Sequence, residues 1–595
     1  MSQAGSDKGQ APVLEATAVA KSFSIGRRHI QALDGVSFAI RPGVVSGLIG
    51  PDGAGKTTLM RLAAGLLVPD SGHIRVLDMD ATRESLKVQA ALGYMPQRFG
   101  LYEDLTVQEN LDLYAALQGV LEAERRERYE ELMHMTGLAP FTGRLTGRLS
   151  GGMKQKLGLA CTLVRAPRLL LLDEPTVGVD PVSRRELWVI IERLVRDQGM
   201  SVLLSTAYLD EAERCDAVIL LHEGRVLDQG LPQAMSARMA GRTWALTQSA
   251  DQPGRRNRDI QAALDGREGV VDALVQGDHV RLVTAASASA ENLIRQAGLK
   301  DVQLKPVPPR FEDSFIDLLR AQAQSPAAAT HMDGLAAASG ARDGPVIQVN
   351  GLRRRFGDFW AVDDISFEVQ RGEIFGLLGA NGAGKSTTFR MLCGLLPASA
   401  GTLRVAGLDL RHAAAAARAR IGYMSQKFSL YGNLSVLQNL AFFASAYGLG
   451  RMEQKERLAW TLEEFELGSY ADQLSGHLPL GYMQRLAMAC ALMHRPEILF
   501  LDEPTSGVDP LARREFWQRI NALARSGVTI LVTTHFMEEA EYCDHLAIMA
   551  AGRILAMDEP AAIKALARTA DNPAPSMEDA FIRLVESDLP QERAA

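Results

Sequence analysis

The strongest hydrophobic runs in this chain have the length of buried strands. "LLLLD" (169–173) and "ILFLD" (498–502) each fit one core strand, and apolar runs followed by helical patterns surround residues 56 and 385. No uninterrupted apolar stretch approaches the roughly 18 residues that a membrane-spanning helix needs. The pattern therefore predicts a soluble α/β chain without a transmembrane segment.

The chain repeats itself at a fixed offset. "GLIGPDGAGKTTLMRLAAGLL" (47–67) recurs as "GLLGANGAGKSTTFRMLCGLL" (376–396), so Lys56 and Lys385 are 329 residues apart. The same offset relates two more pairs of segments, 93–107 with 422–436 and 169–181 with 498–510. Self-similarity on this scale indicates two homologous domains in tandem.

The first copy carries an insert that the second lacks. Near the end of each copy lies a similar segment, "PRFEDSFIDLL" (309–319) and "PSMEDAFIRLV" (575–585), at an offset of only 266 residues, so about 63 residues are added to the first copy. The pattern inside the insert predicts three elements, namely a strand hairpin at 270–284, a helix at 289–298 and a strand at 302–307. We expect a small α+β domain followed by a flexible linker rich in Ala, Gly and Ser.

Each copy contains the phosphate-binding pattern G-x-x-x-x-G-K-[ST] between a predicted strand and a predicted helix. Backbone N–H groups would surround a phosphate at the helix N-terminus, the lysine would reach the terminal phosphates, and the next hydroxyl would ligate Mg²⁺. The residues concerned are Gly50, Gly53, Gly55, Lys56, Thr57 and Thr58 in the first copy, and Gly379, Gly382, Gly384, Lys385, Ser386 and Thr387 in the second.

Two carboxylates stand side by side at the end of one apolar strand in each copy. They are Asp173 with Glu174, and Asp502 with Glu503. The aspartate suits the Mg²⁺ shell, and the glutamate suits orienting and deprotonating the water that attacks the γ-phosphate in line. We therefore predict an ATPase with ATP and Mg²⁺ as cofactors.

Composition argues against several other classes of protein. Lys and Arg number 64 against 71 Asp and Glu, and the net charge of −7 does not favour a nucleic-acid partner. Five scattered cysteines form neither a disulfide framework nor a CxxC zinc site; the repeat-equivalent pairs Cys161/Cys490 and Cys215/Cys543 predict small buried helix residues. The polar start "MSQAGSDKGQAPV" (1–13) gives no sign of a secretory signal.

These motifs resemble those of the ATP-binding cassette (ABC) family, over nearly the whole chain apart from the insert and the linker. The resemblance implies two P-loop NTPase domains. We expect a nucleotide-binding domain at 12–235, an accessory α+β domain at 236–320, a linker at 321–344, a second nucleotide-binding domain at 345–567 and a C-terminal tail at 568–595. The resemblance also implies adenine stacking by Phe23 and Phe356, sensing of Mg²⁺, water and a membrane partner by Gln97 and Gln426, and a position at the interface of paired domains for Asp180 and Asp509.

In this family two domains dimerise head to tail, and the "LSGG" motif of one caps the γ-phosphate held by the other. The first copy has Ser150, Gly151 and Gly152. In the second copy "LSGH" (474–477) looks similar but lies four residues too far from Asp502; spacing aligns "LPLGYMQ" (478–484) instead. Its Pro479 and Leu480 replace the serine and the first glycine, so we expect the γ-phosphate contact to be lost while the helix start survives.

The resemblance also implies a switch histidine that contacts the γ-phosphate and the water. His535 occupies this position in the second copy, and Ala207 occupies it in the first. Under head-to-tail pairing, both departures fall on the site built around Lys56 and Glu174, whereas the site around Lys385 and Glu503 is complete. We expect the first copy to pair with the second, within one chain or between two chains, and to give one working site and one slow site.

The tail pattern P-x-x-E-D-x-F and the segments 99–111 and 428–440 resemble tandem ATP-binding subunits of bacterial drug exporters. This implies a cytoplasmic subunit at the inner face of the cell membrane, working with two separate permease subunits that dock near Tyr102 and Tyr431. One alternative is a soluble tandem ATPase acting on ribosomes or nucleic acid, although 321–344 is shorter and blander than the charged helical linkers of such factors. Another is that the first copy is a regulatory nucleotide sensor.

Overall fold

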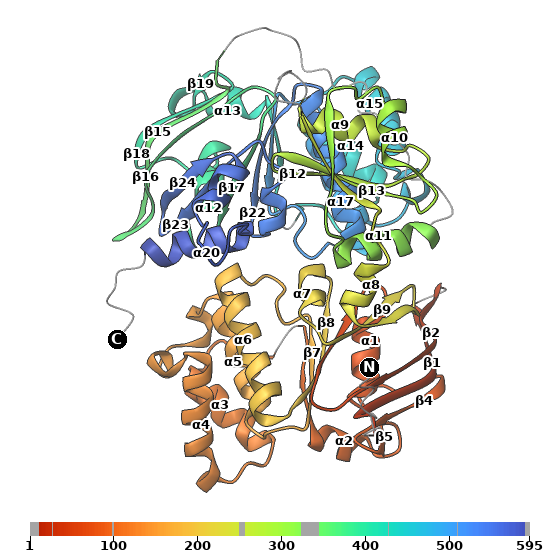
Figure 1. Ribbon diagram of the computed structural model, residues 1–595. Coiled ribbons are helices and arrows are strands. Elements are labelled where there is room, and N and C mark those ends of the chain that lie inside the picture. Colours follow the sequence, from red (N-terminus) through yellow and green to blue (C-terminus); the bar gives the residue numbers. More distant parts are fainter. Residues whose placement is uncertain are drawn as a thin grey trace. The chain divides into compact units, whose positions relative to one another are not determined.

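The computed structural model describes residues 11–25, 28–97, 100–248, 256–322, 344–426, 428–508 and 510–588. Most of the linker expected at 321–344 lies outside these ranges, as do residues 1–10 of the polar start. The chain forms two compact units, residues 1–239 with 310–318, and residues 240–309 with 319–595. Each unit contains one copy of the repeat, in red to yellow for the first and in green to blue for the second (Figure 1).

The first domain (residues 11–239) is built on a six-stranded sheet in the order β10-β9-β3-β8-β7-β6. Its strands are β3 (Val45–Ile49), β6 (Leu92–Met95), β7 (Leu169–Asp173), β8 (Ser201–Thr206), β9 (Ala217–His222) and β10 (Arg225–Gly230). All neighbours are parallel except β9 and β10. Because parallel strands end at the same edge of a sheet, the segments that follow β3, β7 and β8 meet there.

A second, antiparallel sheet of the first domain packs on this one through a shared core. Its order is β2-β1-β4-β5, from β1 (Leu14–Ile25), β2 (Arg28–Ile40), β4 (Ser71–Val76) and β5 (Met79–Asp80). Leu14, Val36 and Ile74 of this sheet belong to the same buried cluster as Leu48 and Leu171 of the parallel sheet. The helices are α1 (Lys56–Ala63), α2 (Ser85–Ala91), α3 (Val107–Leu117), α4 (Glu122–Thr136), α5 (Gly151–Leu163), α6 (Pro181–Gln198), α7 (Leu209–Glu213) and α8 (Pro232–Ala237).

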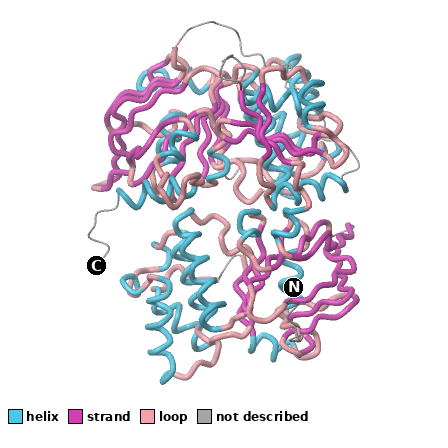
Figure 2. Tube along the Cα trace, in the orientation of Figure 1, coloured by secondary structure: helices cyan, strands magenta, loops and turns pink. Residues whose placement is uncertain are grey.

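The second domain (residues 344–588) repeats this architecture, with sheet orders β16-β15-β18-β19 and β20-β21-β22-β17-β23-β24. Its strands are β15 (Ile347–Phe356), β16 (Phe359–Val369), β17 (Ile374–Gly379), β18 (Ala400–Val405), β19 (Leu408–Asp409), β20 (Ile421–Met424), β21 (Ile498–Asp502), β22 (Thr529–Thr534), β23 (His545–Ala550) and β24 (Arg553–Asp558). Its helices are α12 (Lys385–Leu392), α13 (Leu410–Arg418), α14 (Val436–Ala446), α15 (Arg451–Glu464), α16 (Leu480–Ala491), α17 (Pro510–Arg525), α18 (Met537–Ala540), α19 (Pro560–Ala565) and α20 (Met577–Asp588). Figure 2 shows this alternation of helices and strands.

The insert (residues 240–309) folds as β11 (Thr243–Gln248), α9 (Asn257–Leu264), β12 (Val270–Gln276), β13 (His279–Thr284), α10 (Ala290–Gln296) and β14 (Val302–Pro306). Its antiparallel sheet has the order β12-β13-β11-β14, which with this βαββαβ succession is the ferredoxin-like arrangement. The expected hairpin, helix and last strand are present; the pattern missed β11 and α9. Although the insert follows the first domain in sequence, it belongs to the compact unit of the second.

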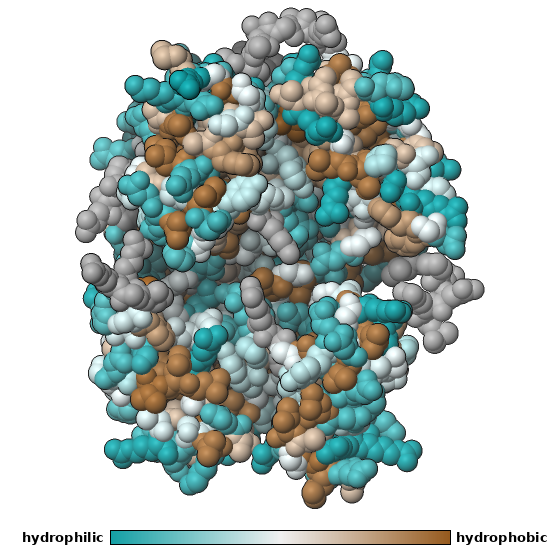
Figure 3. All heavy atoms as spheres, turned by 180° about the vertical axis from the view of Figure 1, so that it is seen from behind, coloured by the Kyte–Doolittle hydropathy of each residue, from teal (hydrophilic) through white to brown (hydrophobic). Residues whose placement is uncertain are grey.

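Each copy closes with a helix that carries the shared tail pattern. These helices are α11 (Phe311–Gln322) and α20, so part of the expected C-terminal tail is ordered helix packed on α18, α19 and β24. Among the described helices, none combines the length and apolarity needed to cross a membrane. The face in Figure 3 carries hydrophobic patches interspersed with hydrophilic residues.

All five cysteines are buried and free. Cys161 and Cys490 lie in helices α5 and α16, as expected. Cys215 and Cys543 are also buried, but they follow the short helices α7 and α18 instead of lying in them.

Candidate nucleotide-binding sites

The phosphate-binding pattern of the first domain forms the turn between β3 and α1. Gly55 stands at the start of α1 with φ 103°, and a Cβ atom there would lie 2.4 Å from the carbonyl oxygen of Ala32. Only glycine tolerates both this backbone conformation and this approach. Since Gly55 has no side chain with which to cap α1, the first N–H groups of the helix are available to an anion at its positive end.

Lys56 is fixed at this turn. Its Nζ donates hydrogen bonds to the carbonyl oxygens of Gly50 (2.8 Å) and Pro51 (3.1 Å), and it lies 3.1 Å from Glu174 Oε1. The side chain is 5% exposed, so the ammonium group is held beside the loop instead of in open solvent. The turn thus combines a fixed cation with free backbone donors, which suits a phosphate group.

Asp173, the last residue of β7, and Glu174, which follows it, meet the phosphate-binding turn at the same edge of the sheet. Thr57 Oγ1 donates to Asp173 Oδ1 (3.2 Å), and Gln97 Nε2 donates to Glu174 Oε2 (2.6 Å). The other oxygen of Asp173, Oδ2, is buried without a hydrogen-bond partner among the described residues. A buried carboxylate oxygen in need of a partner, next to a threonine hydroxyl, fits Mg²⁺.

The second domain reproduces the lysine and glutamine contacts of the first, at the turn between β17 and α12 and at the end of β21. Lys385 Nζ donates to the carbonyl oxygens of Gly379 (2.6 Å) and Ala380 (3.1 Å). Gln426 Nε2 donates to Glu503 Oε2 (2.7 Å). The sequence-predicted lysine, glutamine and glutamate are therefore brought together in both copies.

His535 distinguishes the second site from the first. Its Nδ1 lies 3.3 Å from Glu503 Oε2, and Lys385 Nζ lies 3.9 Å from Oε1 of the same carboxylate. Burial alone would raise the pKa of Glu503, but His535, Lys385 and Gln426 outweigh it and lower the pKa, whereas burial raises the pKa of Asp502. Glu503 is thus held as the deprotonated carboxylate that a general base requires. At the equivalent position of the first domain stands buried Ala207.

The helices that follow the signature positions begin differently in the two domains. Ser150 is the N-cap of α5, and its Oγ accepts a hydrogen bond from the N–H of Met153 (3.3 Å). Pro479 holds the same place before α16 without a side-chain cap. Gly152 is also needed for packing, because a Cβ atom there would lie 2.3 Å from Ser183 Oγ on α6.

The serine of "LSGH" (474–477) has a structural role. Ser475 is 1% exposed, donates to the carbonyl oxygen of Tyr431 (2.8 Å) and accepts from Asn439 Nδ2 (3.2 Å). Thr146 of the first domain accepts the equivalent bond from Asn110 (3.0 Å). Ser475 therefore corresponds to Thr146 and not to Ser150, in agreement with the spacing.

We expect Ser475→Ala to lower the free energy of unfolding of the chain by about 1–3 kcal/mol, because Asn439 would lose a buried partner. ATP hydrolysis per folded molecule should not change. Chemical denaturation and phosphate release measured on the same preparation check both parts. A normal stability with lost hydrolysis would instead assign Ser475 to the nucleotide.

The other residues implied by the resemblance lie as follows. Asp180 caps α6, accepting from Ser183 N (3.1 Å) and Ser183 Oγ (2.9 Å), and its counterpart Asp509 lies outside the described residues. Phe23 is partly buried near the end of β1, and Phe356 ends β15 with 47% of its surface exposed. The guanidinium of Arg354 lies 4.6 Å from the centre of the Phe356 ring, and stacking of this ring on adenine stays a prediction.

Two hydroxyl residues of the sites were missed by sequence reasoning. Ser205 Oγ donates to Asp173 Oδ1 (2.7 Å) and accepts from Glu174 N (3.0 Å). Thr533 Oγ1 makes the same pair of bonds, to Asp502 Oδ1 (2.7 Å) and from Glu503 N (2.9 Å). These bonds fix the glutamates at positive φ, 51° for Glu174 and 46° for Glu503. The repetition of a hydroxyl at this place in both copies was the available signal.

A family model described as "ABC transporter" matches residues 33–177 and 362–506. "Probable multidrug ABC transporter ATP-binding protein YbhF" of Escherichia coli (strain K12) is 52% identical over 548 residues, 92% of this chain and 93% of the relative. The chain belongs to the ABC transporter family.

This ABC protein has other relatives. "Putative ABC transporter ATP-binding protein BL0043" of Bifidobacterium longum is 29% identical over 87% of this chain and 63% of the relative. "Nod factor export ATP-binding protein I" of Cupriavidus metallidurans is 44% identical over 36% of this chain and 71% of the relative. A solved structure described as "Structure of ATP binding subunit of ABC transporter" is 30% identical, covers 40% of this chain and 99% of that chain, and has a TM-score of 0.37.

The resemblance to tandem ABC ATP-binding subunits is confirmed, as is the α/β fold with two P-loop domains. Membership of this ATPase family implies that the chain binds and hydrolyses ATP.

Proposed function

We propose that this chain energises an exporter through separate membrane permease subunits, with one competent and one slow ATP site. The observation that carries the two-site part is the contrast between His535, 3.3 Å from Glu503, and Ala207 at the same position of the first domain. The transport part draws on the relative from Escherichia coli, which is described as a probable multidrug ABC transporter ATP-binding protein. The alternative function, a tandem ATPase that acts on ribosomes or nucleic acid, has no such support.

In the proposed mechanism the second site carries most turnover. Glu503 takes a proton from the attacking water, His535 and Gln426 hold that carboxylate and the water, and Lys385 offsets the charge that develops on the phosphate oxygens. Ser150 of the first domain, or of another chain, supplies the γ-phosphate contact. The first site, which has Ala207 and faces Pro479 and Leu480, binds ATP and turns over slowly.

Mg²⁺ would bind at each site beside Thr57 and Asp173, with Gln97, and beside Ser386 and Asp502, with Gln426. It would supply charge neutralisation at the β- and γ-phosphates. Within the described ranges no group of three or more His, Cys, Asp or Glu side chains could hold a metal. Oxygen ligands from the nucleotide would therefore complete the shell, which is how Mg²⁺ is usually bound.

The first domain has a groove suited to a permease helix. A cavity of about 390 Å³ is lined by Leu66, Tyr94, Tyr114 and Leu117 among others. Leu66 and Leu117 are 51% and 71% exposed, which is unusual for large apolar side chains around one cavity. In the second domain the rings of Tyr431 and Phe442 pack edge to face with their centres 4.7 Å apart, and both side chains are exposed. Tyr102 is likewise exposed.

We expect Leu117→Asp to weaken recovery of the chain with membranes by roughly tenfold in cells that express the permease subunits, since it places a charge in an apolar contact. ATP hydrolysis by the purified chain should not change. Val189→Asp is the matched control, because Val189 is also an exposed apolar helix residue (55%) but lies on α6, away from the groove. Equal recovery of both variants, or sedimentation with ribosomes, would contradict the proposal.

A further inference from the structure

The insert packs on the second domain through one face of its sheet. Along β12, Ala273 and Val275 point into the core of the insert itself. Leu274, which points the opposite way, belongs to the same buried cluster as Trp517 and Tyr542 of the second domain. This alternation follows from the two-residue period of a strand. Figure 1 shows α9 of the insert beside α17.

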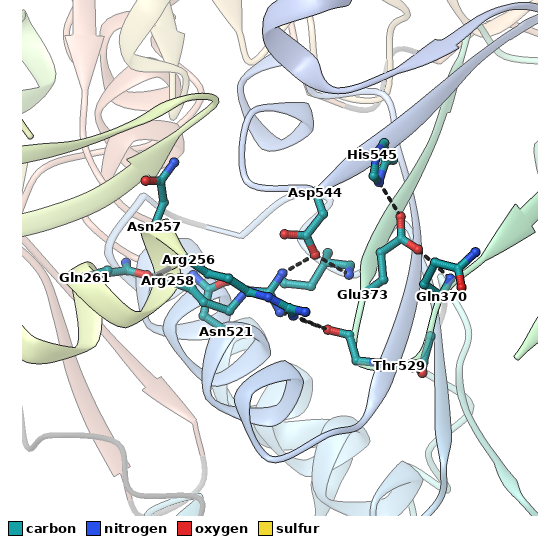
Figure 4. A network of polar contacts seen from close by, with 12 residues as sticks. Arg256, Asn257, Arg258, Gln261, Gln370, Glu373, Asn521, Thr529, Asp544 and His545 are labelled. Atoms are coloured by element: carbon teal, nitrogen blue, oxygen red, sulfur yellow. Dashed lines mark hydrogen bonds and ion pairs between the residues drawn. The ribbon is translucent and has the colours of Figure 1, made fainter. Parts of the chain in front are cut away.

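One end of the contact lies at the amino-terminal ends of the parallel strands. Arg258 is buried and forms an ion pair with Asp544, which is 33% exposed, and its Nη1 donates to the carbonyl oxygen of Gly372 (3.1 Å). Asn521 Nδ2 donates to Gln261 Oε1 (2.7 Å), as Figure 4 shows. The nucleotide site is at the opposite ends of these strands, so this part of the contact anchors the insert without approaching the site.

The other end of the contact lies at the start of α17, the helix that follows the loop after the catalytic carboxylates. Asp272 of β12 forms an ion pair with Arg514, and both side chains are at least 94% buried. Arg514 is the fifth residue of α17, which begins directly after Asp509. At the first end of the contact, where Asn257 Nδ2 donates to the carbonyl oxygen of Gly277 (3.0 Å), the N–H of Gly277 donates to the carbonyl oxygen of Glu541 (2.8 Å), which follows α18.

The start of α17 also packs against the residues around His535. The guanidinium of Arg513 lies 4.6 Å from the ring centre of Phe536, and its Nε is 3.7 Å from Glu539. Glu539 in turn accepts from Thr534 Oγ1 (2.7 Å). Thr534 and Phe536 are the two sequence neighbours of His535. These contacts join the first turns of α17 to the residues on either side of the histidine that faces Glu503.

The first domain has the same two arginines and similar contacts of the first of them, since Arg184 lies 5.8 Å from the ring centre of Tyr208 and Thr206 Oγ1 donates to Glu211 (2.6 Å). It differs at the second arginine. Arg184 and Arg185 of α6 correspond to Arg513 and Arg514. Arg185 is exposed, whereas Arg514 is 5% exposed against Asp272. The fold of the domain therefore does not require this arginine to be buried, and the difference is due to the insert.

We propose that Asp272 is a positioning residue for the second ATP site, acting through Arg514 on α17 and His535. The insert, which follows the first domain in sequence, thus acts on the turnover of the second. This inference rests on the proposed function, in which the second site carries most of the hydrolysis. Asp272 lies on β12 of the insert, and its ion-pair partners are Arg514 and Arg320 (3.5 Å). Its removal should therefore change the rate of turnover and not the binding of ATP.

The test is steady-state ATP hydrolysis by the full chain carrying Asp272→Asn. We expect kcat, expressed per molecule that binds a fluorescent ATP analogue, to fall by about 3- to 30-fold with KM unchanged. Counting only nucleotide-binding molecules removes any loss due to misfolding. Asp272→Glu, which keeps the charge, should restore most of kcat.

Two control variants distinguish an effect on the position of α17 from a general loosening of the insert on the second domain. Arg258→Gln removes the ion pair with Asp544 at the opposite end of the contact, and it should lower the melting temperature without lowering kcat. Arg185→Ala changes the exposed equivalent of Arg514 in the first domain, and it should change neither the melting temperature nor kcat. A wild-type kcat in Asp272→Asn, or an equal loss in Arg258→Gln, would overturn the inference. Failure of the proposed function gives a different result, namely continued hydrolysis by Glu503→Gln, whatever Asp272→Asn does.

Discussion

Replacing Glu503 with glutamine is expected to abolish nearly all steady-state ATP hydrolysis, a fall of about 100-fold or more. Glutamine keeps the size of the side chain but cannot take a proton from water. The carboxylate it replaces is held by Gln426 at 2.7 Å and faces His535 at 3.3 Å, and these neighbours with Lys385 lower its pKa. Phosphate release at saturating MgATP measures the effect.

Glu174→Gln is the matched variant in the first domain. Glu174 has the same partner, Gln97 at 2.6 Å, and the same backbone conformation, but Ala207 stands where the histidine would be. We therefore expect this variant to lose much less hydrolysis than Glu503→Gln while still binding ATP. The reverse ranking of the two variants would refute the assignment of the working site.

Placing the Pro-Leu pair of the second domain at the signature positions of the first domain should reduce hydrolysis about as much as Glu503→Gln does. The double variant Ser150→Pro/Gly151→Leu is expected to reduce hydrolysis by about 100- to 1,000-fold, the usual result of removing preorganised donors to transition-state charge. Proline is tolerated at a helix start, as Pro479 before α16 illustrates, and Gly152 is left in place because Ser183 leaves no room for a Cβ atom. The measurement is phosphate release, with circular dichroism to check that α5 has folded.

The reciprocal variant Pro479→Ser/Leu480→Gly serves as the control. It restores the signature that would face the first site, but that site still has Ala207. Hydrolysis should therefore stay close to the unmodified value. If the reciprocal variant lost activity and the Ser150→Pro/Gly151→Leu variant kept it, the signature would serve the other site and the proposed pairing would be wrong.

Local patterns predicted most of the residues that the structure brings together in the two candidate sites. The phosphate-binding turns, the paired carboxylates, the glutamines and His535 lie in short motifs whose chemistry depends on residues close in sequence, and the structure brings each set together. Spacing also separated Ser475 from Ser150, and the buried bonds of Ser475 agree. Ser205 and Thr533 were not predicted, because a hydroxyl in a buried strand has no motif of its own.

The sequence by itself determined that this chain has two copies of an ABC ATPase domain and that the copies differ at Pro479, Leu480 and Ala207. Such conclusions need only residue types and spacing within each copy. Tertiary structure alone decided that the insert belongs with the second domain, through Arg258 with Asp544 and Asp272 with Arg514. Those partners are 286 and 242 residues apart in the chain, and the complementarity of charge and burial that joins them exists only after both surfaces have folded.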